Sequence, residues 1–327
     1  MIVASERGPQ GVRLVAIDEH GDRRFELVAP TRVTTRDSNP TISPDGRWMV
    51  FASTRDRTLD STSLWIVALG VEAPPRRLTN LGIDSHPIWM PDGRAIVFAS
   101  TRAGGDFDLW RLAIDPRGAP GAIVQLTSSP DHEIQPTVAP DGTIAYAAVH
   151  PLGPHEVESR IEERAIDGSV RSLTSGPADS SPAYSPDGRS LVFARPAEHA
   201  GKAHGELWRI ARSRSAVVQR LIALPLTDES GPVWSPDGRF VFATSVLRTD
   251  DGRVLFSSVV HVDLQEPTLR ARILGDRAGA VARLTPAVRA RRLDVAALHA
   301  DPEYLPELAR IMTVKINEQI QREAGTR

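Results

Sequence analysis

Short apolar runs recur along the chain, and polar turn residues separate them. Five runs follow turns, at residues 48–52, 96–99, 144–147, 191–194 and 240–243, and three shorter runs precede turns, at 87–89, 182–184 and 232–234. Runs of this length that are bounded by Gly, Pro, Asp and Ser are typical of β-strands rather than helices. The pattern therefore predicts a chain of many short strands.

The tripeptide Pro-Asp-Gly stands between the runs and occurs five times. Its prolines are Pro44, Pro91, Pro140, Pro186 and Pro236, at intervals of 46–50 residues. Proline presets φ for a turn, aspartate bonds its own backbone, and glycine accepts the left-handed conformation that closes a tight hairpin. A fixed period of this size indicates stacked supersecondary units, each with strand, turn and strand at its centre.

An apolar residue followed by threonine ends each unit, and there are six such pairs. They are at 33–34, 78–79, 126–127, 173–174, 226–227 and 284–285. One unit then reads as a four-stranded antiparallel meander, which is the size of a propeller blade. We therefore predict an all-β fold, a six-bladed β-propeller of four-stranded antiparallel blades.

The two ends of the chain carry the remaining predictions about the fold. The first blade has no innermost strand of its own, so we expect residues 292–298 to complete it and to close a propeller that spans 1–299. Residues 300–327 are predicted to form a C-terminal α-helix and tail, because apolar residues recur there at helical spacing. This helix could dock on the propeller or on a partner.

Composition narrows the function classes. The 327 residues are 41% hydrophobic with a net charge of −2, which allows a large core and gives no support for nucleic-acid binding. There is no cysteine, so disulfides and thiolate metal sites are excluded. No apolar run approaches 18 residues, so we expect no transmembrane helix. Charged residues follow directly on the first five, so we expect a cytoplasmic protein or a trimmed mature form.

The complete repeat resembles that of TolB-type propellers. The residues that carry the resemblance are an apolar residue and Thr, then an acid, Pro, an aromatic residue and Ser-Pro-Asp-Gly-Arg, as at 226–239. The resemblance covers about residues 35–285 and implies a periplasmic binding protein. TolB binds a peptidoglycan-associated lipoprotein and has an additional N-terminal α/β domain, which this sequence does not show. The same repeat also occurs in prolyl-oligopeptidase-type peptidases and in oligogalacturonate lyases.

One acid stands three residues before the strand proline in five units. These acids are Asp37, Asp84, Glu133, Asp179 and Glu229. Since the first strand of a blade is innermost, we predict that they ring one mouth of the central channel and could hold a Ca²⁺ ion or a basic peptide. The simpler interpretation, which we prefer, is that each acid bonds local amides or an arginine of its own blade. The arginines in question are Arg7, Arg55, Arg102 and Arg195.

Histidine offers a weaker candidate for chemistry. His86 and His132 flank the innermost strands of adjacent blades, and with Asp84 and Glu133 they form the best metal-ligand set. They occupy different slots of the repeat, and the sequence lacks the paired histidines of a zinc helix, a nucleophile elbow and a phosphate loop. We therefore assign no catalytic residue and expect no cofactor, with Ca²⁺ as the one candidate ion.

The irregular segments after the second strand of each blade are the expected recognition elements. The longest are 151–159 and 196–206. The function we favour is therefore a non-enzymatic scaffold that binds a protein or peptide, in a periplasmic cell-envelope assembly. The alternative is a metal-dependent, lyase-like carbohydrate enzyme with its site in the channel.

Overall fold

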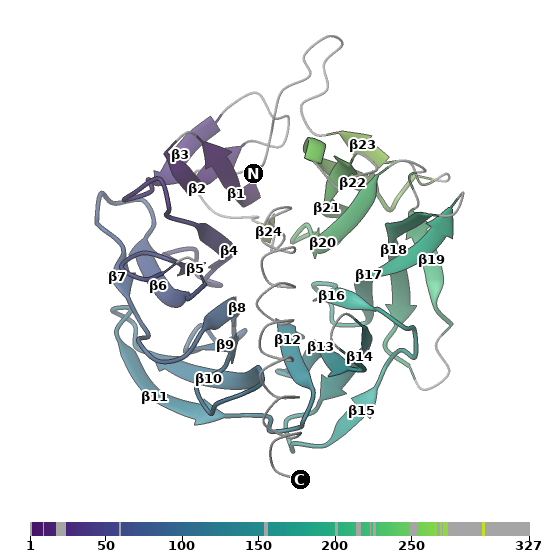
Figure 1. Cartoon of the computed structure of the whole chain (residues 1–327), viewed down its shortest axis with the longest axis horizontal. Coiled ribbons are helices and arrows are strands. Elements are labelled where there is room, and N and C mark those ends of the chain that lie inside the picture. Colours follow the sequence, from purple (N-terminus) through teal and green to yellow (C-terminus); the bar gives the residue numbers. More distant parts are fainter. Residues whose placement is uncertain are drawn as a thin grey trace.

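Six sheets are arranged around a central axis, as a six-bladed β-propeller (Figure 1). This computed structural model describes residues 2–8, 10–17, 24–58, 60–153, 156–199, 202–213, 217–222, 224, 227–248, 254–266, 269, 271–273 and 296–297. Within these ranges every sheet has four strands. The predicted C-terminal helix and tail, 300–327, lie outside the described residues.

The strands follow the blades in chain order. The first blade holds β1 (Ile2–Gly8), β2 (Gly11–Ile17), β3 (Arg24–Val28) and β24 (Ala296–Ala297). The second holds β4 (Asp37–Ile42), β5 (Trp48–Ser53), β6 (Ser63–Ala68) and β7 (Arg76–Arg77). The third holds β8 (Asp84–Trp89), β9 (Ala95–Ser100), β10 (Asp108–Ile114) and β11 (Pro120–Gln125).

The other three blades repeat this order. The fourth holds β12 (His132–Val138), β13 (Ile144–Pro151), β14 (Val157–Arg164) and β15 (Val170–Ser172). The fifth holds β16 (Ser180–Tyr184), β17 (Ser190–His199), β18 (Lys202–Ala211) and β19 (Gln219–Ile222). The sixth holds β20 (Asp228–Trp234), β21 (Phe240–Arg248), β22 (Val254–Asp263) and β23 (Ala271–Ile273).

Neighbouring strands of the second to sixth blades are antiparallel, as expected from the hairpin turns. The first blade differs from the all-antiparallel prediction, because β24 pairs with β1 in parallel through Ile2 and Val3. No hairpin joins β24 to β1, so no turn dictates its direction. Of the predicted closing segment 292–298, the structure describes only Ala296 and Ala297, which form β24.

The Pro-Asp-Gly turns have the predicted geometry. In the second blade the amide of Gly46 donates to the carbonyl of Ser43 at 2.8 Å, and Gly46 has a φ of 71°. The Oδ1 atom of Asp45 accepts from the Ser43 hydroxyl at 2.6 Å and from the Arg47 amide at 3.0 Å. The glycine of each of the other four turns also has a positive φ, between 66° and 86°. Local chemistry therefore determines these hairpins.

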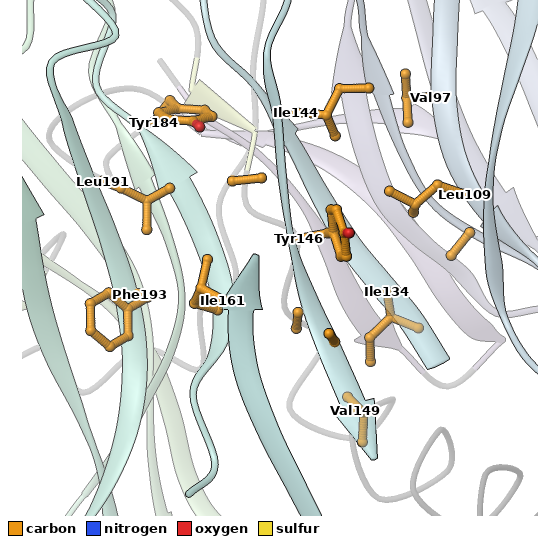
Figure 2. Close-up of a cluster of buried hydrophobic side chains, with 14 of the residues drawn as sticks. Val97, Leu109, Ile134, Ile144, Tyr146, Val149, Ile161, Tyr184, Leu191 and Phe193 are labelled. Carbon is orange, nitrogen blue, oxygen red and sulfur yellow. The ribbon is translucent and has the colours of Figure 1, made fainter. Parts of the chain in front are cut away.

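The core lies between blades rather than within them. Figure 2 shows one such cluster, in which Leu109, Tyr146 and Ile161 lie between the strands of three successive sheets. Alternate residues of each strand face opposite sides of its sheet, and both sides are covered by a neighbouring blade. This explains why β9 is buried along its whole length. Among the described residues, no helix has the length and apolar character needed to cross a bilayer.

Three of the repeated threonines, Thr79, Thr127 and Thr174, replace a missing strand hydrogen bond. The Oγ1 atom of Thr79 accepts from the Leu64 amide at 2.8 Å, and Thr127 does the same for the Leu109 amide at 2.8 Å. Each threonine thus continues the ladder of the third strand after its fourth strand has ended. The sequence mark is therefore explained by backbone satisfaction.

One segment predicted as a loop is largely β-structure, and a second is β-structure at its two ends. Strands β17 and β18 pair through His199 and Lys202, so most of 196–206 is a hairpin arm. Strands β13 and β14 likewise pair through Pro151 and Val157. The sequence alternation there is too weak to indicate strands, and cross-strand pairing within the blade supplies the missing stabilisation.

Candidate functional site

The five acids occupy equivalent places at one end of the propeller. Asp37 and Asp84 are the first residues of β4 and β8, Glu133 and Glu229 are the second residues of β12 and β20, and Asp179 directly precedes β16. Every one of them is at most 1% exposed. The Pro-Asp-Gly turns close the other ends of these strands. The acids therefore lie at the end of the propeller that carries the hairpin arms.

Three of the acids are paired with an arginine of their own blade. Arg55 donates to both carboxylate oxygens of Asp37, from Nε at 3.0 Å and from Nη2. In the third blade, Nη2 of Arg102 lies 2.8 Å from Oδ1 of Asp84. The described residues thus hold these carboxylates in ion pairs with side chains that are themselves buried.

The third ion pair, between Arg195 and Asp179, uses a different register position. Arg195 donates from Nε and Nη2 to the two oxygens of Asp179, at 2.6 and 2.8 Å. Ser180 pairs with Ala194, so Arg195 stands directly opposite Asp179, whereas Arg55 stands two residues beyond the partner of Asp37. The side chain of the fourth predicted arginine, Arg7, lies outside the described part of β1.

Aromatic rings cover the other face of these guanidinium groups. The Arg102 guanidinium lies 4.8 Å from the ring centre of Phe98 and 5.3 Å from that of Trp110. The Arg195 guanidinium lies 5.3 Å from both Phe193 and Trp208. Stacking on aromatic rings compensates in part for the loss of hydration. Acid, arginine and rings form one buried unit in each of these blades.

Burial and the arginine act against each other on the carboxylates. Burial raises the pKa of Asp37 to about 6, and the Arg55 guanidinium opposes that rise. Burial likewise raises the pKa of Asp84, against the charge of Arg102. A pKa of about 6 leaves Asp37 ionised at neutral pH, so its ion pair with Arg55 is intact and its carboxylate is not open to an added cation.

The two glutamates have hydroxyl partners instead of an arginine. The Thr127 hydroxyl lies 2.9 Å from Oε2 of Glu133, and the Ser129 hydroxyl bonds its Oε1. The Thr227 and Ser245 hydroxyls lie 2.6 and 2.9 Å from Oε1 of Glu229. Burial raises the pKa of both glutamates to about 7, because no guanidinium opposes it. These two acids are half protonated near neutral pH.

The register explains why arginine is missing in these blades. The position that Arg55 occupies in the second blade is taken by His150 in the fourth and by Leu247 in the sixth. His150 bonds Asp131 instead, with Nδ1 2.7 Å from Oδ1. The two glutamates therefore have no arginine to neutralise them, whereas the three aspartates do.

The two histidines predicted as metal ligands have different hydrogen-bond partners. Nδ1 of His132 accepts from the Phe107 amide at 3.1 Å, and burial lowers the pKa of His132, so the ring is neutral. His86 is buried on β8, with Nδ1 3.1 Å from the Ser85 hydroxyl. Among the described residues, no group of three or more His, Asp or Glu side chains is arranged to hold a metal ion.

The sequence interpretation missed a bulge in the innermost strands of the second to sixth blades, β4, β8, β12, β16 and β20. The residue two positions after each acid has a left-handed backbone, and the pairing register shifts there. These residues are Asn39, His86, Gln135, Ser181 and Gly231. The one signal that could have identified the bulge is the proline that follows, because it cannot donate to the ladder.

Asp108 is a second residue that the sequence did not single out. It begins β10, is 3% exposed, and accepts from Gln125 at 3.0 Å. Burial raises its pKa to about 6, and the charges of Asp106 and Asp108 help to raise that of Glu133. Asp108 belongs to the third blade and Glu133 to the fourth, so only the assembled ring shows that the two are neighbours.

A cavity of about 310 Å³ lies between the fifth and sixth blades. It is bounded by the β17–β18 arm and by β20 and β21, and Glu229 lines it. Asp228 and His204 also line this cavity, with Nδ1 of the histidine 3.5 Å from Oδ1 of the aspartate. Glu229, one of the five acids, thus faces a cavity formed by the described residues.

Comparisons with known proteins agree with this geometry. The PD40 family, described as the TolB β-propeller domain, matches residues 15–237. The Tol-Pal system protein TolB of Rhizorhabdus wittichii is 42% identical over 72 residues, which are 22% of this chain and 15% of that protein. The match thus spans a small part of that relative.

Solved structures share the fold at lower identity. The putative TolB of Agrobacterium tumefaciens is 20% identical with a TM-score of 0.63, over 82% of this chain and 88% of that one. The oligogalacturonate lyase of Vibrio parahaemolyticus is 14% identical with a TM-score of 0.52, over 84% and 72%. The family match covers more than half of the chain, and the repeat, the turns and the six blades account for it. This chain belongs to the TolB β-propeller domain family.

Proposed function

We propose that this propeller is a non-enzymatic scaffold that binds a protein or peptide at the end that carries the five acids and the hairpin arms. The observation that carries the proposal is the inequality of the blades at this end. Three acids are neutralised by arginine, whereas Glu229 remains without an arginine beside a cavity that an extended arm helps to form. Connecting segments that project from a rigid scaffold are a usual place for recognition.

The cellular setting is part of the same proposal. The matched relative is named a Tol-Pal system protein, and we infer that this chain also acts in a cell-envelope assembly in the periplasm. The alternative is a metal-dependent carbohydrate enzyme. The lyase structures share the fold, but the described residues offer no group of three metal ligands to support it.

Site-directed cross-linking tests the scaffold proposal. The chain has no cysteine, so a single introduced cysteine is a unique attachment point for a photo-cross-linker. Glu158→Cys places the probe on the exposed start of β14, at the arm end, and Arg94→Cys places it at an exposed turn at the opposite end. We expect an envelope partner to cross-link to the first variant and not to the second. Equal cross-linking from both ends, or from neither, would refute the proposal.

A further inference from the structure

Glu229 has one satisfied oxygen and one that lacks a partner. Its Oε1 accepts from the Thr227 and Ser245 hydroxyls, whereas its buried Oε2 has no hydrogen-bond partner among the described residues. The residue is 1% exposed and lines the cavity between the fifth and sixth blades. A buried polar atom without a partner is costly, so this acceptor indicates a ligand that donates a hydrogen bond.

The cavity combines apolar walls with a second acid. Ala194, Pro196 and Val246 line it together with Asp228. The side chain of Asp228 is 35% exposed, and its nearest basic side chains are His204 at 3.5 Å and Arg248 at 3.6 Å. These distances exceed the 2.7–2.9 Å of strong charge-assisted hydrogen bonds. Asp228 can therefore take up a stronger cationic partner.

The positive charge in the walls is already engaged. Arg195 lines the cavity, and its Nε and Nη2 both bond Asp179, at 2.6 and 2.8 Å. Asp228 and Glu229 are the acids without such a bidentate partner. A ligand cation thus meets two carboxyl groups, whereas a ligand anion would meet them as well and be repelled.

We propose that this cavity binds the lysine or arginine side chain of a protein or peptide partner. The aliphatic stem would pack against Ala194, Pro196 and Val246, and the cationic head would donate to Glu229 Oε2 and to Asp228. The inference rests on the scaffold function proposed above and names the side chain that the scaffold recognises. Long basic side chains suit a cavity with apolar walls and an acid at its base.

Binding should depend on pH in a defined direction. Burial raises the pKa of Glu229 to about 7, and a bound cation favours its ionised form. The charged or titratable groups that line the cavity are Asp228, Glu229, His204, Arg195 and Arg248. Affinity for a cation should therefore rise from pH 6 to pH 8.

In the test, the full ¹⁵N-labelled chain is titrated with small probes, and binding is monitored by NMR. The probes are N-acetyl-lysine methylamide and N-acetyl-arginine methylamide, with N-acetyl-norleucine methylamide as the uncharged match. We expect saturable shifts around Gly205 and Ser230 with at least one cationic probe and not with norleucine. Glu229→Gln should weaken binding roughly tenfold, because it removes a charge-assisted bond. Glu72→Gln changes an exposed glutamate that does not line the cavity and should leave affinity unchanged.

Three results would overturn the inference. They are binding of the norleucine probe as tight as that of both cationic probes, unchanged affinity in Glu229→Gln, and no saturable binding of either cationic probe by the wild type. If Glu229→Gln fails to fold, Asp228→Asn at the partly exposed rim takes its place, with a several-fold loss expected and an unchanged affinity counting against us. Cross-linking from Glu158→Cys is independent of these probes, so the scaffold proposal can stand when the cavity inference fails.

Discussion

The Asp37–Arg55 pair allows a sharp test of what the buried ion pairs contribute. Asp37 is fully buried and Arg55 is 4% exposed. Arg55→Met keeps the length of the stem near Phe51 but removes the guanidinium. Asp37 then retains only the Ser53 hydroxyl, at 2.5 Å, and the Ala29 carbonyl loses its donor at 2.6 Å.

The expected loss depends on pH. Breaking a buried pair by removing one partner costs about 3–5 kcal/mol of unfolding free energy when the remaining group stays charged. Asp37 can escape that cost by taking a proton, because burial alone raises its pKa far above 3.8. Its folded pKa then exceeds the unfolded one, so stability falls as pH rises. We expect a loss of about 3–5 kcal/mol at pH 8 and about 1–2 kcal/mol at pH 5.

Asp37→Asn provides the complementary perturbation. It leaves a guanidinium that cannot lose its charge in this pH range, and it removes the titration of Asp37, whose raised pKa of about 6 lowers wild-type stability as pH rises. The loss should therefore be about 3–5 kcal/mol at pH 5 and about 1 kcal/mol smaller at pH 8. Arg47→Met is the matched control, because its pair with Asp45 is exposed, at 64% and 43% of the two side chains. Such a pair contributes less than about 1 kcal/mol.

The assay is urea unfolding at pH 5, 6, 7 and 8, followed by the fluorescence of the six tryptophans. The reasoning is refuted if Arg55→Met loses as much stability at pH 5 as at pH 8. It is equally refuted if Asp37→Asn costs no more than the exposed control. Either outcome would mean that the carboxylate keeps water or another cation as its partner.

Three further predictions concern the glutamate, the turns and the threonines. Burial raises the pKa of Glu133 from 4.5 to about 7, so its contribution to stability falls as pH rises between these values. Glu133→Gln should therefore make the free energy of unfolding, measured in urea, less dependent on pH. At pH 8 this variant should be more stable by about 1–2 kcal/mol after allowance for solvent screening. Gly188→Ala should lower the free energy of unfolding by about 2–4 kcal/mol, since its Cβ would lie 2.9 Å from a proline ring and its φ is +67°. At Gly70 an added Cβ has open space, so Gly70→Ala should cost about 1 kcal/mol. Thr79→Val should cost about 1–2 kcal/mol and speed hydrogen exchange at the Leu64 amide, which loses its acceptor; unchanged exchange would contradict the role given to this threonine.

The sequence alone determined the elements whose cause is local. The Pro-Asp-Gly hairpins form because each residue has the backbone preference that its turn position requires, and Gly46 adopts the positive φ. The blade period follows from the spacing of these turns, and the inter-blade core follows from strands that are apolar on both faces. The position of the five acids at one end follows from the same register.

Only the tertiary structure decided what each acid does. Asp37 and Asp179 share a sequence slot, yet their arginines come from different register positions, and the glutamates have hydroxyl partners instead. Asp108 meets Glu133 only across two blades, and the cavity beside Glu229 exists only because the β17–β18 arm stands next to β20. Turn chemistry acts over four residues and is legible in the sequence. The environment of a carboxyl group is set by strands far apart in the chain, and therefore by the assembled ring.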